Sequence, residues 1–232
     1  MLKIVCWKWN PPDGIHPKKK MVFSSHHVNV LRNMLKRNLK MDHQLVCITD
    51  NPSGIDPDIP IIPLWSDYAE LGGCYRRLRL FSNEMHEMIG PRFASIDIDT
   101  VITQDVTPIF DCKDDFKIWG DTHPKTPYNG SLFIMNAGSR HRVWDEFSEN
   151  CKGIGRRYGY VGTDQAWIAA CLGSNESRWT ICDGIYSFRV HHAKPRVTDM
   201  DSRTRMVFFH GSSDPSQILI QNRYKWVRDN WL

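Results

Sequence analysis

The stretch FASIDID, residues 93–99, begins as an apolar run and ends in two aspartates. Its apolar half favours a buried strand. In an extended chain alternate side chains share a face, so Asp97 and Asp99 would project together, about 6.6 Å apart at their Cα atoms. Two neighbouring carboxylates are costly without a cation, and a divalent cation held there would neutralise a diphosphate. The alternative is that one aspartate caps a following helix while the other is solvated.

The chain before this stretch predicts a βαβ unit. Residues 2–7 form a short apolar run, residues 26–39 carry apolar side chains at helical spacing, and residues 44–49 form a second apolar run. Strand, helix and strand within about fifty residues are typical of a parallel sheet whose ligand crevice lies at the carboxyl ends of the strands. We therefore expect an α/β domain.

Further elements are expected along the rest of the chain. The spacing of Leu78, Phe81, Met85 and Met88 predicts a helix over 74–89 with these side chains on one side. Other expected elements are strands at 59–64, 116–119, 131–135 and 207–210 and helices near 140–150 and over 163–172.

Composition and charge bound the class of protein. The 232 residues are 41% hydrophobic and 24% charged, which excludes intrinsic disorder, collagen and a bare coiled coil. The first fifty residues hold seven lysines and two arginines against three aspartates, a net charge of +6, and the other 182 residues sum to −2. This asymmetry predicts a phosphate-bearing partner near the N-terminal region, unless Lys18, Lys19 and Lys20 form a solvated loop.

The cysteines and the chain start indicate the compartment. Seven cysteines form no CxxC pair and no regular framework, so we expect reduced, buried thiols. The start MLKIVCWKWNPP is too short and polar for a signal peptide, and no run reaches the roughly 18 apolar residues that a membrane span requires. These features predict a soluble, cytoplasmic protein without a transmembrane segment.

One reading of the paired aspartates is a phosphatase. Asp97-Ile-Asp99-Thr-Val101 fits the DxDx[TV] signature of haloacid-dehalogenase-like phosphatases, in which the first aspartate is a nucleophile. That family has its motif on the first core strand, whereas about ninety residues with a βαβ pattern come first here. The acidic pair Asp114 and Asp115 follows too soon to be the late metal pair of that family.

Five short motifs favour a different family. They are Tyr75-Arg76-Arg77-Leu78-Arg79-Leu80, Ser95-Ile-Asp97-Ile-Asp99-Thr, Tyr128-Asn129-Gly130-Ser131-Leu-Phe-Ile, Gly162-Thr163-Asp164-Gln165, and Phe209-His210-Gly211 before Pro215. In this order they resemble the motifs of GT-A glycosyltransferases, and the nearest pattern is family 8, the glycogenin and lipopolysaccharide galactosyltransferase type. The resemblance implies a single GT-A-type, Rossmann-like domain over 1–215, with a mixed, mostly parallel central sheet flanked by helices. A tail over 216–232 is expected to pack on it through Trp226 and Trp231.

The resemblance implies a metal site. Asp97 and Asp99 would be the DxD pair, Asp99 and His210 would be direct ligands of manganese or magnesium, and Asp97 would bind both the metal and a ribose. Because His210 follows an apolar run, the alternative is a satisfied core histidine.

The resemblance also implies a cation for the donor diphosphate. The family has a lysine before the proline, where this chain has Asp214 before Pro215. Arg77 matches the family's arginine and is the first candidate to supply the charge, with Lys8 or the loop over 18–20 as further candidates. The alternative for Arg77 is an arginine on a helix surface.

The remaining candidate residues are expected to bind the sugar and the nucleotide of the donor. Asn129 would bind the donor sugar, unless Asn129-Gly130 is a hairpin turn. Asp164 would orient the acceptor hydroxyl or the sugar with Gln165 beneath the anomeric carbon, unless Asp164 only caps a helix. Four further residues are candidates for contacts with the base, ribose or phosphates: Trp7, Lys8, Asp50 and Gly211.

These expectations define an enzyme. It would use manganese or magnesium to transfer a sugar from a nucleotide diphosphate donor, UDP-linked, with retention of anomeric configuration. The acceptor stays open between a glycan, a lipid-linked sugar, a protein and a modified nucleic acid, and the sequence does not indicate an oligomeric state. The alternatives are the phosphatase and a noncatalytic protein that binds nucleic acid or another polyanion.

Overall fold

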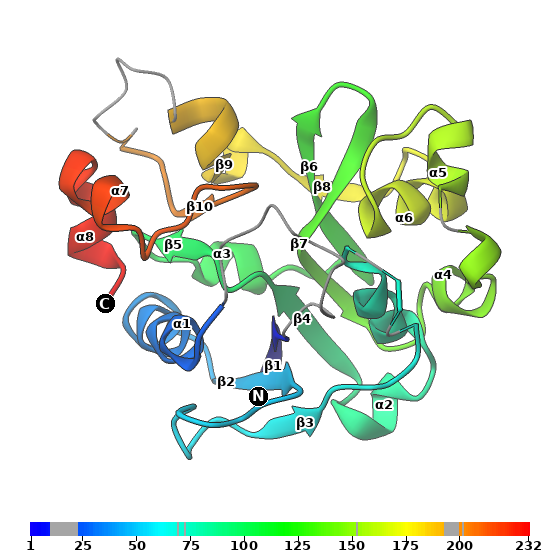
Figure 1. Cartoon of the computed structure of the whole chain (residues 1–232), viewed down its shortest axis with the longest axis horizontal. Coiled ribbons are helices and arrows are strands. Elements are labelled where there is room, and N and C mark those ends of the chain that lie inside the picture. Colours follow the sequence, from blue (N-terminus) through cyan, green and yellow to red (C-terminus); the bar gives the residue numbers. More distant parts are fainter. Residues whose placement is uncertain (10–22, 69, 72, 152, 193–199, 201) are drawn as a thin grey trace.

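A seven-stranded sheet forms the centre of the molecule (Figure 1). The computed structural model describes residues 1–9, 23–68, 70–71, 73–151, 153–192, 200 and 202–232. The strand order is β3-β2-β1-β4-β7-β6-β8, and only β7 runs against its neighbours. The mixed, mostly parallel sheet is therefore confirmed. Its strands are β1 (Leu2–Lys8), β2 (His43–Thr49), β3 (Ile61–Pro63), β4 (Arg92–Ile96), β6 (Phe116–His123), β7 (Thr126–Asn136) and β8 (Ser177–Trp179).

A second, three-stranded sheet has the order β5-β10-β9. It consists of β5 (Thr100–Ile102), β9 (Ile185–Ser187) and β10 (Met206–Phe208). In the antiparallel pair of β5 and β10, Thr100 lies opposite Phe208, and the next backbone N–H, that of Phe209, donates to the carbonyl of Asp99 at 2.9 Å. This pairing brings the chain after β10 beside the acidic turn after β4.

Each face of the central sheet carries its own apolar core. Because side chains alternate along a strand, Ile4 and Cys6 of β1 point to one core and Val5 and Trp7 to the other. The helix α1 (Ser25–Asn38) and the second sheet cover the first face (Figure 1). The second face is covered by the 3₁₀ helix η1 (Tyr75–Phe81) and the α-helices α4 (Arg142–Asp145) and α6 (Asp164–Leu172).

The remaining elements are short helices between the strands and near the C-terminal end of the chain. They are the α-helices α2 (Met85–Met88), α3 (Thr107–Phe110), α5 (Ile154–Arg157), α7 (Ile218–Arg223) and α8 (Lys225–Asn230), the 3₁₀ helices η2 (Glu149–Cys151) and η3 (Ile181–Asp183), and the π-helix η4 (Phe188–His192). Trp226 and Trp231 are 8% and 5% exposed and join the core beside α1. Among the described residues, no helix is long and apolar enough to cross a bilayer.

Two of the expected helices are not formed as predicted. The helix over 74–89 is split into η1 and α2 around residues 82–84. The buried side chains Tyr75, Leu78 and Phe81 recur every three residues, which is the period of a 3₁₀ helix, while Met88 is 43% exposed. The helix near 140–150 is only the four-residue α4, followed by η2.

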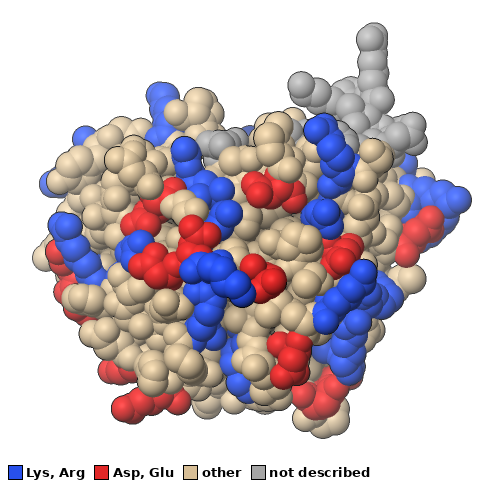
Figure 2. Space-filling view, turned by 180° about the vertical axis from the view of Figure 1, so that it is seen from behind, with Lys and Arg blue, Asp and Glu red and all other residues tan. Residues whose placement is uncertain are grey.

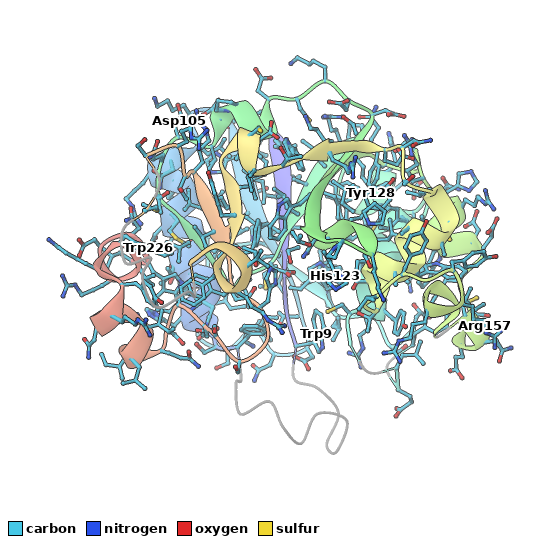
Figure 3. All side chains as sticks on the ribbon, turned by 90° about the horizontal axis from the view of Figure 1, so that it is seen from above. Trp9, Asp105, His123, Tyr128, Arg157 and Trp226 are labelled. Atoms are coloured by element: carbon cyan, nitrogen blue, oxygen red, sulfur yellow. The ribbon has the colours of Figure 1, made fainter. Side chains whose placement is uncertain are left out.

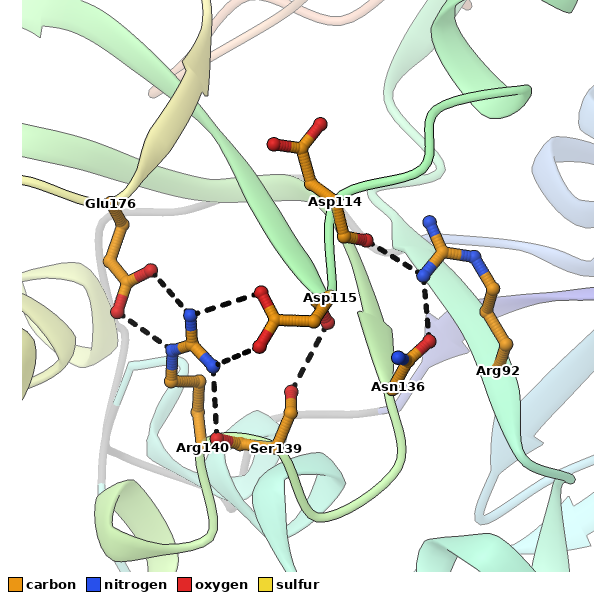
Figure 4. Close-up of polar contacts among 7 residues, drawn as sticks. All are labelled: Arg92, Asp114, Asp115, Asn136, Ser139, Arg140 and Glu176. Atoms are coloured by element: carbon orange, nitrogen blue, oxygen red, sulfur yellow. Dashed lines mark hydrogen bonds and ion pairs between the residues drawn. The ribbon is translucent and has the colours of Figure 1, made fainter.

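A network of hydrogen bonds and ion pairs joins three loops at one edge of the central sheet (Figure 4). The guanidinium of Arg140 donates to both carboxylate oxygens of Glu176 at 2.7 and 2.8 Å and to Asp115 at 2.9 Å. Arg140 follows β7, Asp115 precedes β6 and Glu176 precedes β8. The network therefore joins the ends of three neighbouring strands.

The cysteines are less uniform than expected. All seven lie in the described part of the chain and are free thiols. Cys6, Cys47 and Cys151 are buried as expected, Cys74, Cys112 and Cys171 are only half-buried, and Cys182 is exposed, so the expectation of buried thiols is confirmed for three cysteines and wrong for Cys182.

Candidate active site

A cavity of about 420 Å³ opens where β1 and β4 end. In Figure 3, Trp9 lies between the side of the molecule that carries Trp226 and the side that carries Arg157. Every one of the five sequence motifs contributes a side chain to the cavity wall. The lining residues are Trp7, Trp9, Phe23, Gly73, Cys74, Arg77, Asp97, Ile98, Asp99, Asn129, Ser131, Gly162, Thr163, Asp164, Gln165, Phe209, His210 and Gly211.

Arg77 joins three of these segments. It is 6% exposed, and its Nε and Nη2 donate to Oδ2 of Asp164 at 3.1 and 2.8 Å while its Nη1 donates to Oδ1 of Asp97. Burial opposes the charge, yet the carboxylates of Asp164 and Asp97 raise the pKa of Arg77 well above its usual value. The alternative of an arginine on a helix surface is therefore wrong.

Asp164 begins α6, and its carboxylate faces the cavity. It is 3% exposed, and besides Arg77 it accepts a hydrogen bond from the hydroxyl of Thr163 at 3.0 Å. The N-cap position belongs to Thr163. Asp164 lies in the first turn of α6, where the helix dipole favours a negatively charged side chain. The capping alternative does not describe the contacts of Asp164, and Gln165 beside it also lines the cavity.

Gly130 leaves room for this ion pair. A Cβ at this position would lie 2.5 Å from Oδ2 of Asp164 and 3.2 Å from Nη2 of Arg77. A side chain would therefore push the carboxylate and the guanidinium apart.

Asn129 sits in a bulge and not in a hairpin turn. The turn between β6 and β7 lies at residues 124–125, inside a hairpin whose register shifts so that Ile118 pairs with Phe133 and Trp119 with Asn129. The residues between Asn129 and Phe133 bulge out of the ladder with β6, while Leu132 stays paired with Ile96 of β4. Within the bulge, Oδ1 of Asn129 accepts the backbone N–H of Ser131 at 2.9 Å. The hairpin alternative is wrong, and the bulge places Asn129 at the cavity.

A turn, not a strand, presents the two aspartates. The strand β4 stops at Ile96, and the hydroxyl of Thr100 donates to the carbonyl of Asp97 at 2.8 Å to close the turn. Alternation along a strand is therefore not the reason that Asp97 and Asp99 line the same cavity. The backbone bond from Phe209 to Asp99 then sets His210 on the neighbouring wall, where its ring stacks on Trp119 with centroids 5.6 Å apart.

Asp97, Asp99 and His210 supply donor types that suit a divalent cation. Two carboxylates and an imidazole fit manganese, and the carboxylates alone fit magnesium. In the part of the chain that the structure describes, no group of three His, Cys, Asp or Glu side chains is placed to hold a metal ion. Arg77 occupies one oxygen of Asp97. Asp97, Asp99 and His210 therefore have suitable ligand atoms for a divalent cation, but their side chains are not arranged in a coordination geometry.

Several predicted residues lie elsewhere. Lys8 is 6% exposed, and its ammonium donates to the carbonyl of Asn51 at 2.6 Å. Neither Lys8 nor the exposed Asp50 lines the cavity. Asp214 is 1% exposed and pairs with His27, and neither residue lines the cavity. Lys18, Lys19 and Lys20 lie outside the described residues.

Sequence reasoning missed an aromatic part of the wall. Trp9 packs edge-on against Trp7 with centroids 5.9 Å apart, and Phe23 and Phe209 also line the cavity. The spacing of Trp7 and Trp9 was a usable signal, because alternate residues share a face of an extended chain. Phe23 stands alone before α1 and carried no such signal.

Comparisons with known proteins show the fold. No family model and no curated protein sequence matches the chain. The structure resembles galactosyltransferase LgtC in complex with donor and acceptor sugar analogues, with a TM-score of 0.60 and 12% identity over 99% of this chain and 96% of that one. It resembles glycosyltransferase GlyE of Streptococcus pneumoniae TIGR4 with a TM-score of 0.62 and 9% identity over 100% of this chain and 62% of that one. The bifunctional glycosyltransferase WbbM matches with a TM-score of 0.57 and 10% identity, over 99% of this chain and 50% of that one. The chain therefore has the GT-A-type glycosyltransferase fold that its five motifs implied.

Proposed function

We propose that the protein is a metal-dependent glycosyltransferase that moves a sugar from a UDP-linked donor to an acceptor hydroxyl with retention. The observation that carries this proposal is the meeting of all five motifs at one cavity of about 420 Å³. A cavity beyond the carboxyl ends of parallel strands is the usual ligand site of open α/β sheets. The transferase domain would span 1–215, and the tail over 216–232 would pack on it through Trp226 and Trp231.

The charge of the cavity supports metal dependence. Among the described lining residues, the carboxylates are Asp97, Asp99 and Asp164, and the only lysine or arginine is Arg77, which already pairs with two of them. A diphosphate brought to the described part of this wall meets net negative charge, which a divalent cation bound with it would offset. Asp97, Asp99 and His210 would hold that ion, and when bound it would stabilise the charge that develops on the leaving diphosphate.

The chain's own residues then position the reactants. Arg77 holds Asp97 and Asp164 in fixed directions, so that Asp164 can orient the acceptor hydroxyl or the sugar. Gln165 would lie beneath the anomeric carbon and Asn129 would bind the donor sugar. Trp7 and Gly211 line the same cavity and are proposed for the nucleotide.

The direct test measures donor binding. UDP with manganese should raise the melting temperature more than either alone, because a ligand at one hundred times its Kd stabilises a protein by about 2.7 kcal/mol. Asp99→Ala should remove the joint effect. The proposal is wrong if the protein with manganese neither binds UDP nor cleaves any nucleotide sugar of a broad panel, and Asp99→Ala changes nothing.

The alternatives have weaker support. Asp97 follows β4, so the acidic motif is not on the first strand as in haloacid-dehalogenase-like phosphatases. Turnover of p-nitrophenyl phosphate with an aspartyl-phosphate at Asp97 would favour that family. For a polyanion-binding protein, Figure 2 shows one face on which Lys and Arg are interspersed with Asp and Glu instead of gathered in a basic patch.

A further inference from the structure

Asp214 occupies the position before the proline where the family pattern has a lysine. It is 1% exposed, and its Oδ1 lies 3.2 Å from Nε2 of His27. The same oxygen accepts the backbone N–H of Ser216 at 2.8 Å and the hydroxyl of Ser216. The carboxylate therefore faces α1 and its own loop, and it is not among the residues that line the cavity.

The hydrogen bonds around His27 define its tautomer. The backbone N–H of Ser24 donates to Nδ1 of His27 at 3.2 Å, so Nδ1 is an acceptor. The proton of a neutral ring then lies on Nε2, which donates to Asp214. One imidazole thus links the start of α1 to the loop that follows His210.

The His27–Asp214 pair lies directly behind one wall of the cavity. The ring of His27 packs edge-on against Phe23 with centroids 5.5 Å apart, and Phe23 lines the cavity. The ring of His27 also packs edge-on against Trp231, with centroids 5.4 Å apart. Asp214 is four residues after His210, so movement of Asp214 would be transmitted through a short loop to that side chain.

The carboxyl of Asp214 favours its ionised form. Burial opposes ionisation of Asp214, yet hydrogen bonds from His27 and Ser216 hold the pKa of this carboxyl below its usual value. A buried carboxylate is tolerated only while these donors stay in place. The loop over 210–216 is therefore held by the hydrogen bonds to Oδ1 of Asp214, because the buried Oδ2 has no hydrogen-bond partner among the described residues.

We propose that His27 and Asp214 are positioning residues: the pair fixes the loop that presents His210 to the cavity, and Asp214 makes no contact with a donor diphosphate. This proposal rests on the proposed function only in taking His210 as a metal ligand. The position that carries a phosphate-binding lysine in the family serves loop placement in this chain.

The first experiment needs no ligand. Hydrogen exchange of the amides in 209–217 should speed up by about tenfold or more in Asp214→Ala and in His27→Ala, and the double variant should be no faster. Asp214→Asn keeps an acceptor oxygen and should stay close to wild type. The matched control is Arg140→Met, which breaks the network of Figure 4 and should destabilise the protein without faster exchange in this loop. Unchanged exchange in 209–217 in Asp214→Ala would overturn the proposal.

The second experiment separates positioning from phosphate contact. UDP binding with manganese should weaken about tenfold or more in Asp214→Ala and equally in Asp214→Lys, but not in Arg140→Met. If residue 214 faced the diphosphate, Asp214→Lys would tighten UDP binding, and that result would overturn the proposal. If wild type itself fails to bind UDP with manganese, the proposed function is wrong, and hydrogen exchange alone then decides the role of the pair.

Discussion

Arg77 shows how much of the cavity depends on one side chain. Its guanidinium reaches Asp97 and Asp164, which are 20 and 87 residues away in the sequence. An arginine suits this role better than a lysine, because its planar fork can donate to two carboxylates at once.

Replacement of Arg77 should therefore be costly. Arg77→Met leaves two carboxylates without their buried partner, and we expect a loss of about 3–5 kcal/mol in the free energy of unfolding, measured with urea. Arg142→Met is the control, because its pair with Glu146 lies on an exposed helix face, where solvent screening leaves an ion pair with little effect on stability. An Arg77→Met variant as stable as this control would contradict the buried ion pair.

Gly130 gives a second test at this scale. In Gly130→Ala the added methyl would press on the carboxylate of Asp164, and overpacking of this kind costs about 1–3 kcal/mol. The rate of sugar transfer should fall even under conditions in which the variant is fully folded, because the carboxylate of Asp164 is displaced within the cavity. Kinetics alongside urea denaturation measure the two effects.

Gly159→Ala provides the control for Gly130→Ala. Its φ of +85° makes a side chain strained, but no atom lies within 4 Å of the added Cβ. Its stability should fall while donor binding stays intact. An equal loss of the sugar-transfer rate in both variants would contradict the claim that Gly130 leaves room for the carboxylate of Asp164.

At the scale of elements, short strands and turns position the site more than long helices do. The three-residue strands β5 and β10 pair so that Asp99 and the residue before His210 share a backbone hydrogen bond. The bulge in β7 and the 3₁₀ helix η1 then direct Asn129 and Arg77 to the same cavity. Each of these departures from regular structure lies at the candidate site.

The junction of α1 and α3 should respond to acid. Hydrogen bonds from Thr107, then the ion pair with Lys40, lower the pKa of Asp105 to about 2. A native pKa below the unfolded value means that Asp105 stabilises the fold above about pH 4 and that this contribution is lost as the pH falls through about 2. The melting temperature of wild type should exceed that of Asp105→Asn at pH 5, and the two should converge near pH 2. A constant difference across this range would rule out the carboxylate as its source.

At the scale of the whole molecule, both sheets are needed to form the cavity. The central sheet supplies the ends of β1 and β4, and the segment directly after β10 of the second sheet supplies Phe209 and His210. The described walls thereby combine aromatic surface with three carboxylates and one paired arginine.

The excess of carboxylates over cationic side chains in the described wall predicts that the diphosphate, and not the nucleoside, requires the metal for binding. Removal of divalent ions with a chelator should weaken UDP binding by about a hundredfold, because the diphosphate meets uncompensated carboxylates. Uridine carries no phosphate, so its affinity should be the same with and without manganese. Calorimetry measures both, and UDP affinity that is independent of metal would contradict the charge argument.

Local patterns determined a large part of this protein. Apolar runs and helical spacing predicted β1, α1 and β2, because periodicity is a property of consecutive residues. The order of the five motifs implied the fold that the structural comparisons show. The same patterns failed over 74–89, where the spacing of buried residues fits both kinds of helix until packing decides between them.

Only the tertiary structure decided which of these residues meet. It buries Arg77 between Asp97 and Asp164, sets His210 beside the turn that carries Asp99, and turns Asp214 toward His27, 187 residues away in the sequence. Contacts across such separations leave no periodic signal, because they depend on how strands pair and on whether a buried charge finds its partner. The sequence by itself determined the motifs and their order, and folding determined their contacts.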